Sequence, residues 1–125
     1  MLTAASLVGF AATANAQAAK QFYQSVLGLA LVEDAPFALV FNSNGTTLRI
    51  QKVQQVFPIP YTVLGWAVAD IQATVRALSA QGVVFQRYDG LDQDAEGIWQ
   101  SPGGARVAWF RDPDGNTLSL TEAAT

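Results

Sequence analysis

The 125-residue chain contains neither cysteine nor histidine. Without cysteine there is no disulfide framework, no thiolate nucleophile and no zinc–thiolate site. Without histidine, the imidazole ligands of the softer divalent metals are also absent. These absences remove the ligands that softer metals prefer, and no candidate residue is paired in sequence with an obvious base, so we expect no cofactor and no nucleophile–base pair.

Charge is also sparse, because only 14% of the residues are Asp, Glu, Lys or Arg and the net charge is −3. The seven basic residues are scattered, which argues against nucleic acid or an anionic membrane as a partner and mildly favours neutral or cationic ligands. No apolar stretch approaches the roughly 20 residues that span a bilayer. The 50% hydrophobic content is sufficient for a packed core, so we expect a soluble protein.

Residues 1–16 imitate a secretory signal, with an apolar run and a small-x-small ending at Ala14 and Ala16. However, no Lys or Arg precedes the apolar run, and Gly9 interrupts it. A similar pattern recurs in the middle of the chain, at residues 63–68. We therefore interpret the segment as part of the fold and expect the protein to be cytoplasmic.

The two halves of the chain repeat each other. The segment LVGFAA at residues 7–12 resembles VLGWAV at 63–68, and residues 41–50 resemble residues 110–120. The repeat predicts one domain, residues 1–125, made of a module at about 5–53, a proline-containing linker at 54–60 and a module at about 61–122.

Periodicity and turn residues predict the same βαβββ order in both modules, which is an α+β fold. In the first module we expect a strand at 7–13, a helix at 16–27 capped by Asn15 and ended by Gly28, and strands at 29–32, 37–41 and 46–51. In the second we expect a strand at 62–68, a helix from its cap Asp70 to about residue 80, a stop at Gly82, and strands at 83–87, 105–110 and 117–121. Residues 88–104 have no counterpart in the first module and are interpreted as an insertion.

Three motifs resemble the vicinal oxygen chelate superfamily, which includes glyoxalase I, extradiol dioxygenases and the bleomycin and fosfomycin resistance proteins. They are Phe22-Tyr23-x-x-Val26-Leu27-Gly28-Leu29, Gly65-Trp66-x-Val68-x-Asp70-Ile71 and Asp112-Pro113-Asp114-Gly115-Asn116. The resemblance implies that the two modules pair into a curved, half-open barrel around a cleft. It also implies that metal-dependent members carry their ligands on inward-facing strand positions.

Those ligand positions correspond in this sequence to Val8 (or Leu7), Val63 (or Leu64), Arg49 and Ser119. Aliphatic side chains cannot ligate a cation, and a guanidinium repels one. The resemblance therefore implies the fold without its metal site.

Two polar segments are interpreted as structural and not as functional. Residues 112–116 resemble a loop of carboxylates, but Pro113 and Gly115 favour a tight hairpin turn. The acidic run Asp89, Asp92, Asp94 and Glu96 is typical of a solvated loop. The alternatives are a rim of the cleft that attracts a cationic ligand, and, more weakly, a calcium site.

Strand alternation selects the candidate binding residues. Leu48, Ile50, Leu118 and Leu120 are expected under the helices, and Leu64, Trp66 and Val68 are expected to pack inward. This arrangement turns Thr117, Gly65 and Ala67, together with several candidate ligand-binding residues, toward the cleft.

Trp99 and Trp109 are either core residues or stacking platforms, and Trp99 is favoured for stacking because it lies in the insertion. Arg49 either pairs with a structural carboxylate or binds a ligand oxygen. Tyr61 and Tyr88 are placed at the ends of the cleft. The predicted ligand-binding residues are Arg49, Gln51, Thr47, Val63, Trp99, Trp109, Ser119, Thr121, Tyr61 and Tyr88.

These features favour a metal-free protein that sequesters a small organic molecule, planar or cationic, in the manner of the bleomycin resistance proteins. One alternative is a lyase, isomerase or dioxygenase of the glyoxalase type, with atypical ligands such as Gln51 or Glu122, or with Arg49 and a carboxylate in acid–base roles. Another is an interaction module whose cleft a second chain completes. The resemblance and the open-edged modules predict a homodimer.

Overall fold

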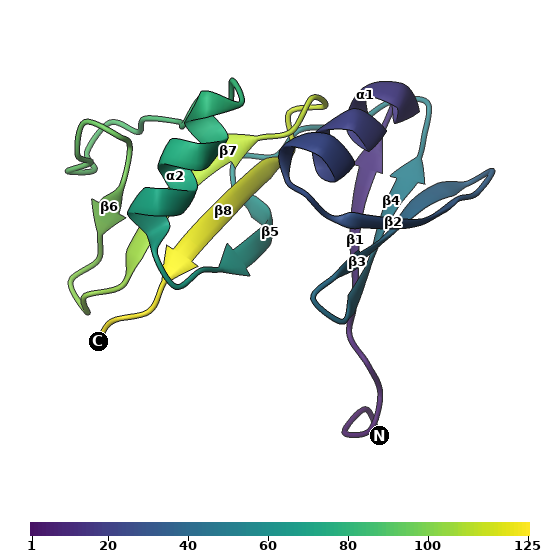
Figure 1. The fold of residues 1–125 in the computed structure, drawn as a ribbon, viewed down its shortest axis with the longest axis horizontal. Helices are drawn as coiled ribbons and strands as arrows, with labels where there is room; N and C mark the ends of the chain where they lie inside the picture. Colours follow the sequence, from purple (N-terminus) through teal and green to yellow (C-terminus); the bar gives the residue numbers. More distant parts are fainter. The chain divides into compact units, whose positions relative to one another are not determined.

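The computed structural model describes residues 1–125 and divides into two compact units, Met1–Pro58 and Ile59–Thr125. The boundary lies inside the proline-containing segment 54–60. Each unit contains one four-stranded sheet and one main helix (Figure 1). No helix is both long enough and apolar enough to cross a membrane.

The first unit has the order strand, helix and three strands. Strand β1 pairs in parallel with β4, while β3 pairs antiparallel with both β4 and β2, so the sheet order is β1-β4-β3-β2. Its elements are β1 (Val8–Thr13), α1 (Ala16–Gln21), the π-helical turn η1 (Phe22–Val26), β2 (Ala30–Asp34), β3 (Ala38–Ser43) and β4 (Thr46–Lys52).

The second unit repeats this topology with sheet order β5-β8-β7-β6, and β5 is again parallel to its neighbour. The predicted α+β fold with two βαβββ modules is therefore confirmed. The elements of the second unit are β5 (Thr62–Ala67), α2 (Ile71–Ala80), β6 (Trp99–Gln100), β7 (Arg106–Arg111) and β8 (Thr117–Glu122).

The helix boundaries follow the predicted caps. Asn15 Oδ1 accepts a hydrogen bond from the Ala18 amide at 3.2 Å, and Asp70 Oδ1 accepts one from the Ala73 amide at 3.0 Å. One prediction needs correction, because residues 16–27 are not a continuous α-helix. After Gln21 the chain widens into η1, where the Leu27 amide donates to the Phe22 carbonyl at 2.9 Å. This wider turn accompanies the burial of two adjacent rings, Phe22 and Tyr23.

In the first unit the core lies on one face of the sheet. The register pairs Leu39 with Ile50 and Phe41 with Leu48, and all four side chains are buried. The Tyr23 ring lies 5.8 Å from the Phe41 ring, so the helical segment packs on this face. The predicted inward positions of Leu48 and Ile50 are confirmed.

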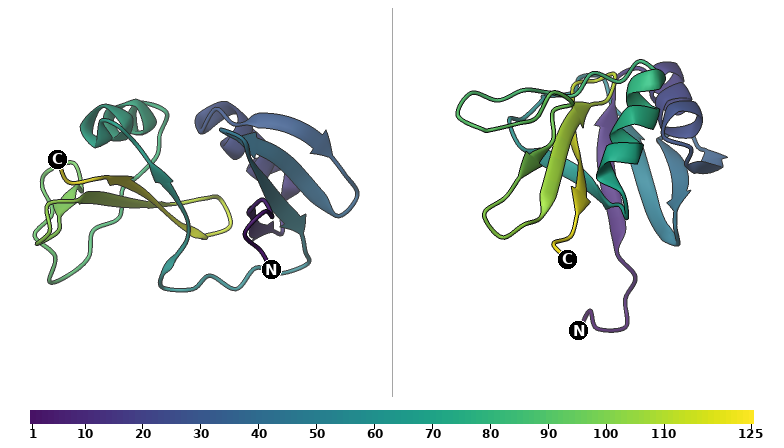
Figure 2. Two further views of the ribbon diagram at one scale, coloured as in Figure 1. Left: turned by 90° about the horizontal axis from the view of Figure 1, so that it is seen from below. Right: turned by 60° about the vertical axis from the view of Figure 1, so that its left-hand side comes forward.

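In the second unit the core lies between α2 and the sheet (Figure 2). Ile71, Val75 and Leu78 of α2 are buried, as are the alternate residues of the two central strands. The latter are Ala108 and Phe110 of β7, and Leu118 and Leu120 of β8. This confirms the predicted inward positions of Leu118 and Leu120.

The predicted strand at residues 83–87 is absent. The fourth place in the sheet is taken by Trp99 and Gln100 of β6, which pair with Val107 and Arg106 of β7. Residues 83–87 make one backbone hydrogen bond to β7, from the Gln86 amide to the Trp109 carbonyl at 2.8 Å. The apolar run that suggested a strand serves the core instead, because the Phe85 ring lies 5.5 Å from Phe110. Residues 88–104 are thus not wholly an insertion, because Trp99 and Gln100 within them form the edge strand of the sheet.

Residues 112–116 form the predicted turn between β7 and β8. Asp112 Oδ1 accepts hydrogen bonds from the amides of Asp114 at 2.9 Å and Asn116 at 3.0 Å, and Asp112 Oδ2 accepts from Asn116 Nδ2 at 2.8 Å. Gly115 adopts φ 87°, which other residues reach only with strain. The Asp112 carboxylate is therefore committed to the turn.

Candidate functional site

The candidate site lies in the second unit, on the sheet face that points away from α2. The register pairs Trp99 with Val107, Val107 with Thr121, Trp109 with Ser119, and Arg111 with Thr117. Directly paired residues share a face. We call this set the aromatic face, and its members are Trp99, Val107, Trp109, Arg111, Thr117, Ser119 and Thr121.

Three aromatic rings meet on this face. The Trp109 ring lies 5.4 Å from the Tyr88 ring at an interplanar angle of 88°, and 6.1 Å from the Trp99 ring at 34°. Such edge-to-face and tilted pairs are favourable ring geometries. Both tryptophans are half-buried. Trp99 lies on strand β6 beside Trp109, and not on a loop over the mouth of a cleft.

A hollow of about 290 Å³ opens beside Trp109, and its lining contains no charged side chain. It brings together three of the predicted binding residues, Tyr61, Tyr88 and Trp109. The volume is close to the lower end, about 300 Å³, of small-molecule pockets. The complete lining is Pro60, Tyr61, Thr62, Tyr88, Trp109 and Thr117.

Strand β5 forms one side of this region and contains an irregular register. The pairing passes from Thr62 opposite Thr117 to Leu64 opposite Leu118, so Val63 has no partner. Thr62, and not the predicted Val63, is the residue that pairs with Thr117 and lines the hollow. Such a bulge shifts the alternation of the strand by one residue.

Further along β5, Gly65 pairs with Ser119 of the aromatic face. A Cβ atom at Gly65 would lie 2.8 Å from Ser119 Oγ, a distance that real Cβ atoms do not tolerate. The two strands therefore approach each other closely at this point because residue 65 has no side chain.

Sequence reasoning did not identify Gln93, which holds Tyr88 in place. Its Oε1 accepts a hydrogen bond from the Tyr88 amide at 2.7 Å, while its Nε2 donates to the carbonyls of Gln86 at 2.8 Å and Gly97 at 2.9 Å. All the hydrogen-bonding groups of one side chain thus brace the loop that carries Tyr88. No sequence signal distinguishes this glutamine from the acidic residues around it.

The remaining predicted residues divide between the units. Thr121 and Ser119 lie on the aromatic face, whereas Thr47, Arg49 and Gln51 lie on β4 of the first unit. The register places these three beside Val8, Phe10 and Ala12 of β1, respectively. The Arg49 guanidinium is half-buried and makes no ion pair or hydrogen bond, so the structural-carboxylate interpretation finds no partner for it.

The residues at the metal-ligand positions do not fit a metal of the family type. Val8 and Val63 have no donor atom and Arg49 is cationic, which leaves the single hydroxyl of Ser119. The atypical candidate Glu122 is engaged elsewhere, because its Oε1 accepts from the Ile71 amide at 3.0 Å and its Oε2 lies 3.5 Å from Arg106 Nη1. No cluster of three or more Asp, Glu, His or Cys residues is arranged to hold a cation.

Two residues of the acidic run hold their own loop. Asp94 Oδ1 accepts from the amides of Glu96 and Ile98, each at 2.9 Å. Glu96 accepts from Arg76 Nε at 3.0 Å and from Gln72 Nε2 at 3.0 Å, which ties the loop to α2. Asp89 and Asp92 are exposed, as in the solvated-loop interpretation.

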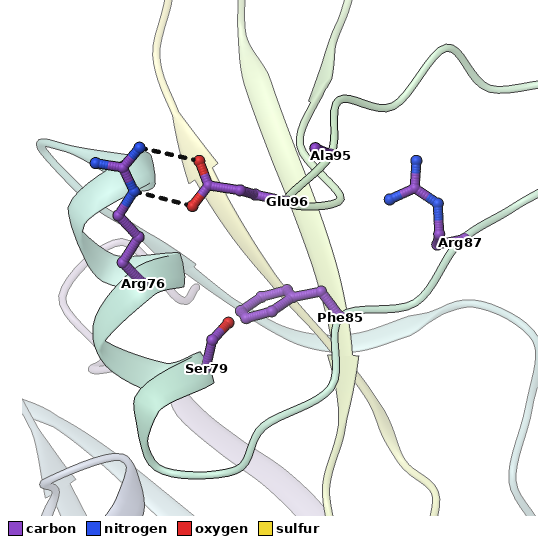
Figure 3. A pocket seen from close by; sticks show the side chains of 6 residues that line it. All are labelled: Arg76, Ser79, Phe85, Arg87, Ala95 and Glu96. Carbon is purple, nitrogen blue, oxygen red and sulfur yellow. Dashed lines mark hydrogen bonds and ion pairs between the residues drawn. The ribbon is translucent and has the colours of Figure 1, made fainter.

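A second hollow, of about 440 Å³, lies between α2 and this loop (Figure 3). Glu96 points toward Arg76, and Ser79 lies beside the Phe85 ring, while Arg87 stands on the other side. The hydrogen bond from Arg76 lowers the pKa of the Glu96 carboxyl, with a further lowering from Gln72, and the same bond raises the pKa of Arg76. Arg76 and Glu96 thus pair with each other across this hollow and connect α2 to the loop, while Arg87 donates to the Gln93 carbonyl at 3.2 Å.

Comparison with known proteins gives a consistent family. The sequence profile of the Glyoxalase/Bleomycin resistance protein/Dioxygenase superfamily matches residues 8–120. No curated protein matches the chain. A solved structure of a superfamily member from Sphaerobacter thermophilus is 25% identical, with 94% of this chain and 98% of that chain covered and a TM-score of 0.72.

Two further solved structures share the fold. Lactoylglutathione lyase from Agrobacterium tumefaciens is 18% identical over 95% of this chain and 94% of its own, with a TM-score of 0.74. A glyoxalase/bleomycin resistance protein/dioxygenase from Alicyclobacillus acidocaldarius is 18% identical over 94% and 89%, with a TM-score of 0.69. At this identity the likeness shows the fold and leaves the activity open.

Proposed function

The chain belongs to the Glyoxalase/Bleomycin resistance protein/Dioxygenase superfamily, and on that basis we propose that it binds a planar organic molecule without the help of a metal ion. The observation that carries the proposal is the hollow on the aromatic face. Trp109, Tyr88 and Tyr61 line it with aromatic rings, and Thr62 and Thr117 line it with polar side chains, of which the Thr117 hydroxyl donates to the Ile59 carbonyl at 3.5 Å. Apolar area with a few polar groups is typical of small-molecule pockets.

Two of the three rings of the hollow, those of Tyr88 and Trp109, are held in place before any ligand arrives. Tyr88 and Trp109 contact each other edge to face, and Gln93 fixes the backbone of Tyr88. Preorganised aromatic side chains offer a large contact area with little loss of rotamer freedom on binding. A flat ring of one or two fused cycles matches the volume of about 290 Å³.

We propose binding and not catalysis because of the chemistry of the lining. It contains no carboxylate, imidazole or amine that could serve as a general acid or base near neutral pH. The positions at which metal-dependent relatives would hold their ion carry Val8, Val63, Arg49 and Ser119, so Lewis-acid chemistry of the family type has no donor set here.

Binding is tested by calorimetric titration of chelator-treated protein with 2-naphthamide, a flat and neutral probe. We expect Trp109→Ala to weaken the affinity about tenfold or more, because the main ring surface is lost. Trp66→Phe is the matched control, since Trp66 pairs with Leu120 and so shares the face of the core. Equal affinities in wild type and Trp109→Ala would refute the assignment of the hollow.

The absence of a metal is tested separately by elemental analysis after exposure to zinc, nickel and manganese. We expect no stoichiometric metal, and one tightly held ion per chain would contradict the proposal. Affinity for 2-naphthamide should be the same before and after this exposure.

We also propose that the protein is a homodimer. Strands β1 and β5 are sheet edges, and Leu7, Val8 and Phe10 on or beside β1 are 80%, 39% and 51% exposed. Exposed edges with apolar side chains are sites of association. Sedimentation at micromolar concentration should give about twice 13.3 kDa, and Phe10→Glu should shift the population to monomer. A wild-type monomer at all concentrations would exclude the dimer.

A further inference from the structure

We infer that Arg111 gives the aromatic hollow a subsite for an anionic group, so that its ligand is a planar aromatic carboxylate. The inference rests on the proposed function and adds the chemical class of the ligand. Sequence analysis did not select Arg111. Strand alternation would have found it, because it lies two residues after Trp109 on the same strand.

The register places Arg111 next to two residues that line the hollow, although Arg111 is not itself part of the lining. It is the direct partner of Thr117, which lines the hollow, and it shares the aromatic face with Trp109. Directly paired Cβ atoms on antiparallel strands are about 4.5–5.5 Å apart. The side chain of Arg111 therefore begins beside Thr117 at the edge of the hollow.

The charge of Arg111 is not neutralised within the protein. Its guanidinium makes no ion pair or hydrogen bond, whereas Arg76 pairs with Glu96 and Arg106 pairs with Glu122. The carboxylate next to it in sequence, Asp112, is buried and accepts three hydrogen bonds inside the hairpin turn. The Asp112 carboxylate is thus engaged in the turn, and Arg111 is left available to a ligand.

The chemistry of these groups selects a flat anion. A guanidinium binds a carboxylate through two parallel hydrogen bonds, and the shared plane suits a carboxylate conjugated to a ring. Trp109 lies two residues before Arg111 on the same face, so a ring bound against Trp109 could carry its carboxylate toward the guanidinium. The net charge of −3 would favour a cation, so the preference for an anion depends on this one side chain.

The experiment compares two probes of the same shape, 2-naphthoate and 2-naphthamide, by calorimetry at low salt. We expect wild type to bind the acid about tenfold more tightly than the amide, a typical gain for a charge-assisted hydrogen bond. In Arg111→Gln the two affinities should become equal, and Arg111→Lys should retain part of the preference because it keeps the charge. Arg106→Gln is the matched control, since Arg106 lies on the same strand but on the opposite face.

The outcomes separate the two proposals. Equal binding of acid and amide by wild type, or a preference that survives in Arg111→Gln, would overturn the anionic subsite and leave the aromatic hollow standing. Failure of both probes to bind wild type would overturn the hollow and the subsite together. Loss of the preference in Arg106→Gln as well as in Arg111→Gln would also overturn the subsite, because the effect would then come from general charge.

Discussion

The two units share a topology, but they differ in the segment that connects the helix to the edge strand, which is β2 in the first unit and β6 in the second. In the first unit, β2 begins two residues after Gly28 and runs for five residues. In the second unit, residues 83–98 intervene and β6 has only two residues. The longer route carries Tyr88 and Gln93, and its end supplies Trp99. The second unit thus gains one lining residue of its hollow, Tyr88, from the segment in which it departs from the repeat.

This difference indicates how a repeated fold acquires a site in one copy. Both units have the sheet and the helix, while in the second unit the irregular loop adds Tyr88 to a hollow whose other lining residues lie on or beside the strands. The loop is not loose, because Gln93 and Asp94 hydrogen-bond to its backbone and Glu96 ties it to α2. Variants that remove hydrogen bonds of this loop, together with matched variants in the first unit, therefore test the difference between the units.

The largest effect is expected from Gln93→Ala. It removes three hydrogen bonds to backbone groups and leaves the Gln86 and Gly97 carbonyls without that partner. We expect a loss of about 2–3 kcal/mol in unfolding free energy, at roughly 1 kcal/mol per bond. Thermal and urea unfolding measure it. Gln51→Ala, an exposed glutamine of the first unit, is the control and should have almost no effect on stability. Comparable losses in both variants would contradict the special role of the loop.

Gly65→Ala should cost about 1 kcal/mol. A new Cβ atom would lie 2.8 Å from Ser119 Oγ, and over-packing costs about 1–3 kcal/mol. A gain of about 0.4–1 kcal/mol from the stiffer unfolded chain offsets part of this. The double variant Gly65→Ala, Ser119→Ala should recover most of the stability, because the clashing oxygen is gone. Additive losses in urea unfolding would show that the close approach is not the cause.

Glu96→Gln should have a smaller effect, and one that depends on pH. The hydrogen bond from Arg76 holds the pKa of Glu96 below its ordinary value, so the stabilisation is present above the ordinary carboxyl pKa and is lost as the pH falls through the lowered one. The difference in Tm between wild type and Glu96→Gln should therefore shrink from pH 7 to about pH 3.

The first unit contains a comparable ion pair, between Lys52 and Asp34, for this measurement. Lys52 hydrogen-bonds Asp34 and lowers the pKa of that carboxyl in the same direction, so Asp34→Asn should show the same trend with pH. A Tm difference for Glu96→Gln that stays constant from neutral to acidic pH would contradict the assigned ion pair.

The smallest effect on stability is expected from Arg49→Ala. Its guanidinium has no partner in the structure, so the unfolding free energy should change by less than about 0.5 kcal/mol. Urea unfolding measures the stability, and calorimetry should show an unchanged affinity for 2-naphthoate, because the hollow is lined by residues of the second unit. A clearly lower free energy of unfolding would show that Arg49 has a structural role.

Much of the fold could be predicted from the sequence, because its signals are local. The caps Asn15 and Asp70 begin the helices, glycines at positive φ follow them, and alternation in β4 and β8 identifies the buried face. The repeat then fixes the order of the elements. Tyr61 and Tyr88 were predicted at the ends of the cleft and Trp109 as a core or stacking residue, and the structure brings all three to one hollow.

The rest depends on contacts that a sequence does not display. The run Val83-Val84-Phe85 has the composition of a strand, but Phe85 packs on Phe110 and the edge is filled by Trp99 and Gln100. The bulge at Val63 shifts the alternation by one residue, which exchanges Val63 for Thr62 at the hollow. The bracing role of Gln93 arises from three partners within the loop fold and has no spacing signature.

The most direct measurement uses the three tryptophans as reporters, because each indole N–H gives a separate NMR signal. Chelator-treated protein is titrated with 2-naphthamide. Trp109 and its neighbour Trp99 should shift, while Trp66, which shares the core face of β5 with Leu64, should not. Addition of zinc should change none of these shifts. Shifts that appear only after zinc is added, or that are confined to Trp66, would contradict metal-free binding in the hollow.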